Sequence, residues 1–314
     1  MASTSNQNIS NVQCPITIDF EPKNITNLSA SVFPTWICLV VINVVTSPPT
    51  VLINSLVIWT VLENKQLRSN SYYLVVAILS LSDLLIGLVV QPLFVSLLIC
   101  IINQCTYICE LTMSCVMLEV LCSALTAVTT AIISLERYLY IEHPLYYQTS
   151  VTSKKLMIAI AVSWVLLGTV LPASRFLVND SYWARQLPVI LTIGLSFVVI
   201  LFCVTKIHLT ARRQMRAIAA QQEPVVQQSK IKEYKRIFTL GLIVLASVAC
   251  LCPILVLKIV GAVKGNWSDD FRYISQGIYV TFFHLQSLIN PIIYSLRLSD
   301  IRTGVAKRLC CNRH

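Results

Sequence analysis

The sequence predicts an all-α fold: a bundle of seven transmembrane helices, with a short amphipathic cytosolic helix after the last span. Of the 314 residues, 56% are hydrophobic and only 12% are charged, whereas soluble domains carry roughly 25% charged residues. Apolar runs long enough to cross a bilayer, about 20 residues each, recur along the chain. So little charge cannot coat a water-soluble body of 35.1 kDa. The composition therefore excludes a soluble globular protein.

Seven apolar runs follow one another, at about 34–62, 73–100, 112–139, 155–173, 187–209, 236–260 and 273–296. Each run is too long for a barrel strand, and none shows period-two alternation. The longest connection, at about 210–235, is polar and rich in Gln. We therefore expect an extracellular tail (1–33), a seven-helix domain (34–296) and a cytosolic tail (297–314).

The stretch after the last span is basic, and its apolar residues recur every three to four positions. They are Leu298, Ile301, Val305 and Leu309. This pattern favours a helix that lies on the membrane surface, in contact with lipid. Cys310 and Cys311 follow basic residues there, and we expect them to be palmitoylated. The alternative is a pair of free cytosolic thiols.

The net charge of +10 indicates an orientation rather than an affinity for nucleic acid. With the amino terminus outside, cytoplasmic segments hold 18 of the 24 Lys and Arg residues, which is the bias of that side. All Asn-x-Ser/Thr acceptors, the motif of glycosylation, fall in segments assigned to the outside: Asn8, Asn24, Asn27, Asn179 and Asn266. Residues 1–30 lack the apolar core of a signal peptide, so we expect the first span to act as the anchor. We expect a multi-pass protein of the plasma membrane.

Three polar residues fall inside the expected spans: Asn54 in the first, Asp83 in the second and Asn290 in the seventh. Hydrogen bonding between helices accounts for Asn54 taken alone. An ionisable group in a bilayer costs several kcal/mol, and an unpaired carboxylate makes a poor link between helices. Asp83 therefore better fits a cation, a proton or a conformational switch.

Several motifs stand in order along these spans. They are Leu79-Ser80-Leu81-Ser82-Asp83, Ser-Leu-Glu136-Arg137-Tyr138, His143-Pro144-Leu145-Tyr146 and Asn290-Pro291-Ile292-Ile293-Tyr294, with Asn54, Trp164 and Pro253 in the first, fourth and sixth spans. Together they resemble the rhodopsin-like (class A) family of G protein-coupled receptors over nearly the whole chain. The resemblance implies a receptor rather than an enzyme. Its implied partners are an extracellular small ligand, a heterotrimeric G protein, arrestin and membrane lipid.

The resemblance also implies an activation switch at the cytosolic end of the third span, formed by Glu136, Arg137 and Tyr138. Glu233 lies 20 residues before Pro253, which places it about 30 Å away, at the cytosolic end of the sixth span. In the family, such a pair holds the two helices together at rest. We expect Glu233→Ala to raise ligand-independent signalling, unless Glu233 is only a solvated charge.

The seventh span carries the second part of the switch. Pro291 removes a backbone hydrogen bond, and Asn290 and Tyr294 share a helix face. With Asp83 and Asn54, Asn290 matches the family's cluster of sodium and water. We therefore expect no cofactor other than an allosteric Na⁺ that opposes activation.

Glu119 precedes Arg137 by 18 residues, so five helical turns, about 27 Å, separate them on one face. Amine receptors carry an Asp at the matching position, which pairs with the ligand ammonium. His284 falls where adenosine receptors carry a His, and Lys258 points near the same chamber. Glu119 either binds a cationic ligand or forms an internal pair with His284 or Lys258. We expect a small cationic amine-like ligand, with a nucleoside-like or peptide ligand as alternatives.

The family pattern fails at two places. Thr112 stands where the family has a Cys, and the loop at 174–187 has no Cys to bond it. A bridge among the remaining outer cysteines has open connectivity. Leu251 replaces the usual Trp of the sixth span, so either other residues carry the relay from ligand to cytosol or the receptor signals differently.

A transporter or channel is the alternative from another class. Paired broken helices and repeat symmetry, which mark transporters, are absent from the sequence. No His-Glu-x-x-His frame and no nucleophile–base pair supports a membrane enzyme.

Overall fold

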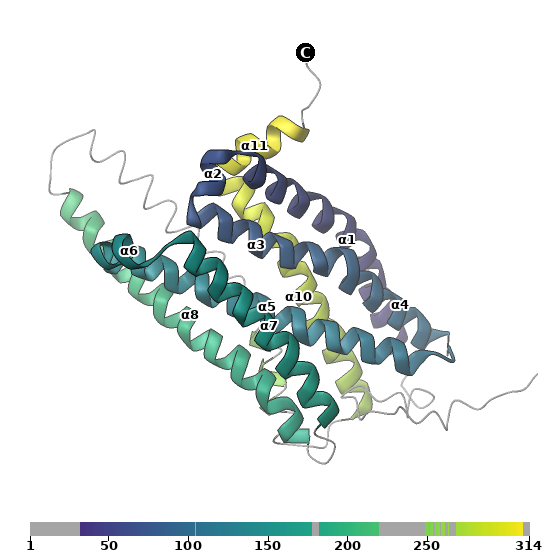
Figure 1. Cartoon of the computed structure of the whole chain (residues 1–314). Coiled ribbons are helices and arrows are strands. Elements are labelled where there is room, and N and C mark those ends of the chain that lie inside the picture. The colour runs from purple at the N-terminus through teal and green to yellow at the C-terminus, as the bar shows by residue number, and fades with distance from the viewer. Residues whose placement is uncertain are drawn as a thin grey trace, which may run out of the picture.

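The computed structural model describes residues 32–103, 105–177, 182–219 and 268–309, with scattered positions between 249 and 263. Every regular element in these segments is a helix (Figure 1). The long helices are α1 (Val32–Glu63), α3 (Ser71–Leu85) continued by η3 (Ile86–Val90) and α4 (Gln91–Ile102), α5 (Ile108–Glu142), α7 (Ser153–Leu177), α8 (Tyr182–Ala219) and α10 (Asp269–Arg297). Short helices follow three of them: α2 (Lys65–Ser69), α6 (Pro144–Ser150) and α11 (Ser299–Leu309).

The long helices match six of the seven expected spans. Five of them are long and apolar enough to cross a membrane: α1, α3 through α4, α5, α7 and α8. The seventh expected span is α10, whose inner face is polar. The sixth, at about 236–260, lies mostly outside the described residues. The expected amphipathic helix after the last span is α11.

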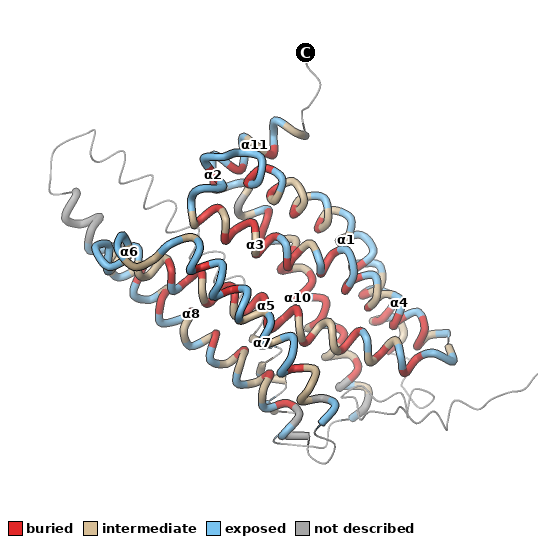
Figure 2. The backbone as a smooth tube through the Cα atoms, in the orientation of Figure 1, coloured by how far each residue is buried: buried red, intermediate tan, exposed pale blue. Residues whose placement is uncertain are grey.

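The third span, α5, lies at the centre of the bundle and packs against α3, α4, α7 and α8. In its most apolar stretch 67% of the residues are buried, against 17% in that of α7. Figure 2 shows buried positions along the faces where α3, α5 and α10 meet, and exposed ones on the outer faces of α7 and α8. Those outer faces carry large apolar side chains such as Val165 and Leu195, as expected for a surface that faces lipid.

A π-helical turn, η3, interrupts the second span. The proline ring at position 92 clashes with the carbonyl four residues earlier in a regular helix and removes a hydrogen bond. The wider turn accommodates this, and the Gln91 N–H reaches back five residues to the Ile86 carbonyl. Such turns shift the helical register. In this span Asp83 and Gln91 are both fully buried, so both turn toward the bundle.

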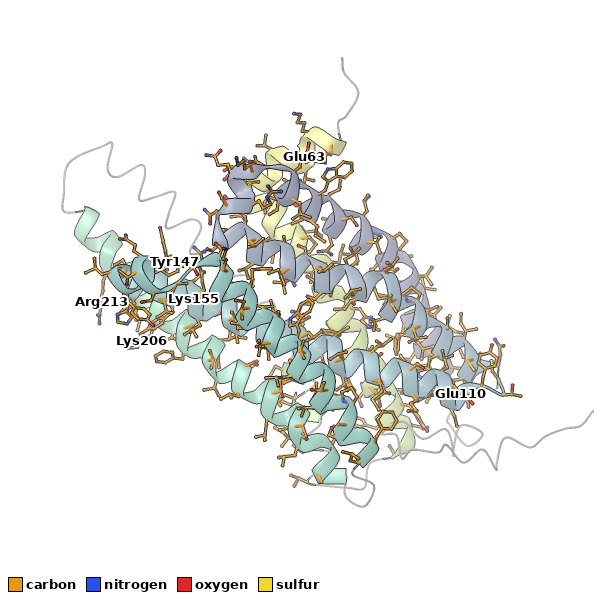
Figure 3. All side chains as sticks on the ribbon, viewed as in Figure 1. Glu63, Glu110, Tyr147, Lys155, Lys206 and Arg213 are labelled. Atoms are coloured by element: carbon orange, nitrogen blue, oxygen red, sulfur yellow. The ribbon has the colours of Figure 1, made fainter. Side chains whose placement is uncertain are left out.

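The two ends of the bundle differ. The three short helices α2, α6 and α11 gather at one end, which we call the α11 end (Figure 1). Tyr147, Lys155 and Arg213 lie toward that end in Figure 3, and Glu110 lies at the opposite end, where α4 turns into α5. Asn64 and Asn70 cap α2 and α3, because their side chains accept from the N–H groups of Gln66 and Tyr72.

Candidate functional site

A column of polar side chains runs along the face of α10 that meets α1 and α3. Thr281, His284, Ser287 and Asn290 are spaced three residues apart and are all buried. Residues at this spacing share one face of a helix. Because burying polar groups without partners is unfavourable, the column defines the candidate site in the bundle interior.

Asp83 forms the lower part of this column with two asparagines. Asn290 Nδ2 donates to Asp83 Oδ2 at 3.0 Å, and Asn54 Nδ2 donates to the Ser287 carbonyl at 2.9 Å. The structure therefore places Asp83 against Asn290, and Asn54 against the same segment of α10. Asp83 Oδ1, Asn54 Oδ1, Asn290 Oδ1 and Ser287 Oγ are buried oxygens without hydrogen-bond partners in the described part of the chain. A concentration of oxygen atoms is the ligand set that a hard cation prefers.

His284 forms the upper part of the column with Asn43 of α1. Its Nδ1 donates to Asn43 Oδ1 at 2.7 Å, and Asn43 Nδ2 donates to Thr281 Oγ1 at 2.9 Å. Gln91 of α4 donates to Thr46 Oγ1 at 3.1 Å beside them. The hydrogen-bond partner of His284 is thus Asn43 of α1, not Glu119 as in the internal pair considered from the sequence.

Glu119 lies on α5 across a narrow cavity from α1 and α10. Cys115 Sγ donates to Glu119 Oε1 at 3.2 Å. Aromatic rings and small polar groups line the cavity with Glu119: Trp36, Phe94, Cys115, Tyr273 and Gln276 are among them. Trp36 is fully buried, and its indole N–H lacks an acceptor among the described residues. The cavity holds about 10 Å³, room for about one water molecule.

The end of α5 near this cavity carries a disulfide. Cys109 is disulfide-bonded, whereas Cys100, Cys105 and Cys115 are free. Cys14, the other outer cysteine of the sequence, lies outside the described residues. Thr112, at the family's usual Cys position, is buried and donates to the Ile108 carbonyl at 2.6 Å.

At the α11 end, Arg137 is held by several side chains. Arg137 Nη2 donates to Glu136 Oε1 at 2.9 Å, and Tyr147 of α6 donates to the same oxygen at 2.6 Å. Burial and the neighbouring Glu136 carboxylate raise the pKa of Tyr147 to about 12, so this hydroxyl remains a donor at physiological pH. Tyr138 stacks against His143 and Phe202 instead, at 5.7 and 5.6 Å between ring centroids.

Several predicted site residues lie outside the part of the chain that the structure describes. Lys258, Glu233, the five glycosylation sites Asn8, Asn24, Asn27, Asn179 and Asn266, and Cys310 and Cys311 lie outside the described residues. Tyr294 is part of α10, but its side chain is outside the described set. Pro291 is buried within α10.

Sequence reasoning missed Asn43, Gln91 and Tyr147. The first two were visible as polar residues within apolar runs, the signal that identified Asn54. Tyr147 gave no such signal, because an aromatic residue near a membrane surface is common.

The fold agrees with the comparison to known proteins. The family model "7 transmembrane receptor (rhodopsin family)" matches residues 53–294. The chain belongs to this family, and is therefore a multi-pass membrane receptor of the G protein-coupled class rather than an enzyme.

Curated relatives include receptors for two amines. The histamine H2 receptor of Cavia porcellus is 26% identical over 268 residues, covering 79% of this chain and 72% of the relative. The D(1)-like dopamine receptor of Takifugu rubripes is 25% identical over 317 residues, covering 84% of this chain and 68% of the relative. The human histamine H2 receptor is 25% identical over 270 residues, covering 79% and 72%.

Proposed function

We propose that this receptor binds a small cationic amine in the cavity beside Glu119. The observation that carries the proposal is the lining itself: one carboxylate on α5 faces a wall that includes Trp36, Phe94 and Tyr273. Aromatic faces and a carboxylate both attract an ammonium group. The Trp36 indole N–H adds a donor for an acceptor atom of the ligand. Histamine and dopamine, for which the relatives are named, have this chemistry.

The cavity is too small for such a ligand as it stands, so binding must move its walls. Gly277, which lines the cavity, packs closely against α1, because a Cβ there would lie 2.6 Å from Leu39 Cδ1. Entry of a ligand would push α1 and α10 apart beside His284 and Asn43. A ligand can shift a conformational equilibrium only through different affinities for its two states. We propose that the polar column of α10 moves when the ligand binds.

The α11 end is proposed to be cytosolic and to meet the G protein, with the amino terminus outside. Basic residues gather at this end, among them Lys155, Lys206 and Arg213 (Figure 3). Such an excess marks the cytosolic side. Arg137 would leave Glu136, and Glu233 of the sixth span, when the receptor activates. Arrestin and membrane lipid are further partners of the same face.

Sodium is proposed as a modulator at Asp83. The unpartnered oxygens of Asp83, Asn54, Asn290 and Ser287 fit a hard monovalent cation. Bound there, Na⁺ would supply charge neutralisation for a buried carboxylate. Asn290 and Ser287 belong to α10, so the same residues would hold that helix toward α3 and α1.

The test replaces Glu119 by Gln, which keeps the shape and removes the charge. We expect Glu119→Gln to weaken the potency of a cationic amine about 100-fold, because a buried charge pair is lost. Neutral agonists should keep their potency. The measurement is signalling by cells exposed to a panel of amines and neutral analogues that includes histamine and dopamine.

The matched control is Glu110→Gln. Glu110 lies on the same helix but is exposed and outside the cavity, so its loss should leave potency unchanged. Equal potency of the cationic agonist on the wild-type receptor and on Glu119→Gln, at equal surface expression, would contradict the proposed site. Activity of nucleosides or peptides alone would favour the other ligand classes.

A further inference from the structure

Arg137 touches an aromatic ring of another helix. Its guanidinium carbon lies 4.4 Å from the ring centroid of Tyr72, at the start of α3. This is within the 6 Å range of cation–π attraction, which strengthens when the pair is withdrawn from water. Tyr72 is 5% exposed, and the Arg137 side chain is 14% exposed. The contact therefore links α5 to α3 in a mostly dry setting.

A second ring near Arg137 does not have this effect. The guanidinium lies 5.3 Å from the ring centroid of Tyr140, which is exposed. Tyr140 follows Arg137 by one turn on α5, so both residues move together with that helix. Of these two ring contacts, the one with Tyr72 resists a movement of α5 relative to α3.

The surroundings hold Tyr72 in place. Asn70 Oδ1 accepts from the Tyr72 N–H at 3.0 Å, and Ser71 Oγ lies 2.7 Å from Ser153 Oγ of α7. The next residue, Tyr73, packs against Tyr72 with ring centroids 5.2 Å apart and donates to Asp300 of α11. Tyr72 thus contacts Arg137 and Tyr73 contacts α11, so two successive residues at the start of α3 hold both partners.

We propose that Tyr72 is a positioning residue that holds Arg137 in the resting receptor. This deepens the proposed function, because it assumes that Arg137 must move to meet the G protein. The restraint acts between the third and second spans, so it is independent of any pair with Glu233. Movement of Arg137 away from Tyr72 breaks the cation–π contact. The contact therefore stabilises the resting state relative to the active state.

The first experiment measures ligand-independent nucleotide exchange by purified receptor in vesicles, with a panel of heterotrimeric G proteins. Tyr72→Leu removes the ring and should raise the basal rate about 3- to 10-fold, the range that a desolvated cation–π contact allows. Tyr72→Phe keeps the ring and should stay close to wild type. Tyr107→Leu, an exposed tyrosine at the opposite end, is the control and should change nothing. A basal rate for Tyr72→Leu at or below wild type would overturn the proposal.

The second experiment does not depend on signalling. Thermal unfolding is measured for Tyr72→Leu, Arg137→Gln and the double variant. If the two side chains interact, the double variant loses less than the sum of the single losses. Additive losses would overturn the proposal. If neither the wild-type receptor nor any variant drives nucleotide exchange on any G protein, the proposed function is contradicted. The comparison of single and double variants by thermal unfolding then decides alone whether Tyr72 holds Arg137.

Discussion

At the scale of single residues, Asp83 is a fully buried carboxylate that we propose to act as a conformational switch. One of its oxygens accepts from Asn290, and the other has no partner among the residues described. A charged oxygen without a partner is costly in a low-dielectric interior. The proposed cation at that oxygen would stabilise the conformation in which Asp83 and Asn290 meet, and movement of α10 would disrupt the site.

Sodium should therefore lower the basal activity of the wild-type receptor. Replacing NaCl with N-methylglucamine chloride at equal ionic strength should raise basal nucleotide exchange roughly 5-fold or more, the lower range of allosteric couplings. Asp83→Asn removes the charge and should abolish the difference between the two salts. KCl serves as the control for ionic strength. A sodium effect that survives in Asp83→Asn would place the cation elsewhere.

The sequence was sufficient to select Asp83, Asn54 and Asn290, because a bilayer makes buried polar residues conspicuous, although Asn43 and Gln91 were missed. Asp83 and Asn290 contact each other directly, and Asn54 bonds the backbone carbonyl of Ser287 on the same helix, α10. The partner of His284 was beyond sequence reasoning. Asn43 reaches it because of how α1 is rotated, and Gln91 joins them because of the π turn before Pro92. Helix rotation depends on the packing of the whole bundle, which spacing along one chain does not determine.

At the scale of elements, α11 is held to the bundle from two sides. Tyr73 of α3 donates to Asp300 at its start, and Arg308 near its end pairs with Glu63 of α1. Arg308 Nη1 also donates to Thr60 Oγ1 at 3.0 Å. Buried Leu298, Ile301 and Val305 face the bundle. The apolar spacing predicted this helix correctly, but its polar contacts with α1 and α3 depend on tertiary packing.

Gly304 permits this close approach of α11 to α1. A Cβ at position 304 would overlap Thr60 Cγ2, and the Thr60 rotamer is held by its bond to the Leu56 carbonyl at 2.7 Å. We expect Gly304→Ala to destabilise the receptor by about 1–3 kcal/mol, the usual effect of overpacking. Thermal unfolding of purified receptor measures it.

Gly168→Ala is the matched control for this change. A Cβ at Gly168 meets nothing within 4 Å, so the variant should be neutral or slightly more stable, because alanine favours a helix over glycine. Equal unfolding midpoints for Gly304→Ala and Gly168→Ala would show that α11 does not pack on α1 as described.

At the scale of the whole molecule, the low content of charged residues and the excess of basic over acidic residues both follow from a helix bundle that spans a membrane. Apolar faces of α1, α7 and α8 are exposed because lipid surrounds them, while polar groups are gathered along α10. Hydrophobic run length alone predicted the spans, since a bilayer imposes a fixed thickness. It did not predict the polar face that α10 buries against its neighbours, because hydropathy averages over both faces of a helix.

The central claim is that a cationic amine, bound beside Glu119, activates a G protein through this bundle. The most direct measurement is nucleotide exchange on a panel of heterotrimeric G proteins by purified receptor in vesicles, with and without each amine of a panel. The account predicts that at least one amine accelerates exchange by wild-type receptor and by Glu110→Gln, but not by Glu119→Gln. Transport of an amine into the vesicles without any exchange, or equal acceleration by Glu119→Gln, would contradict it.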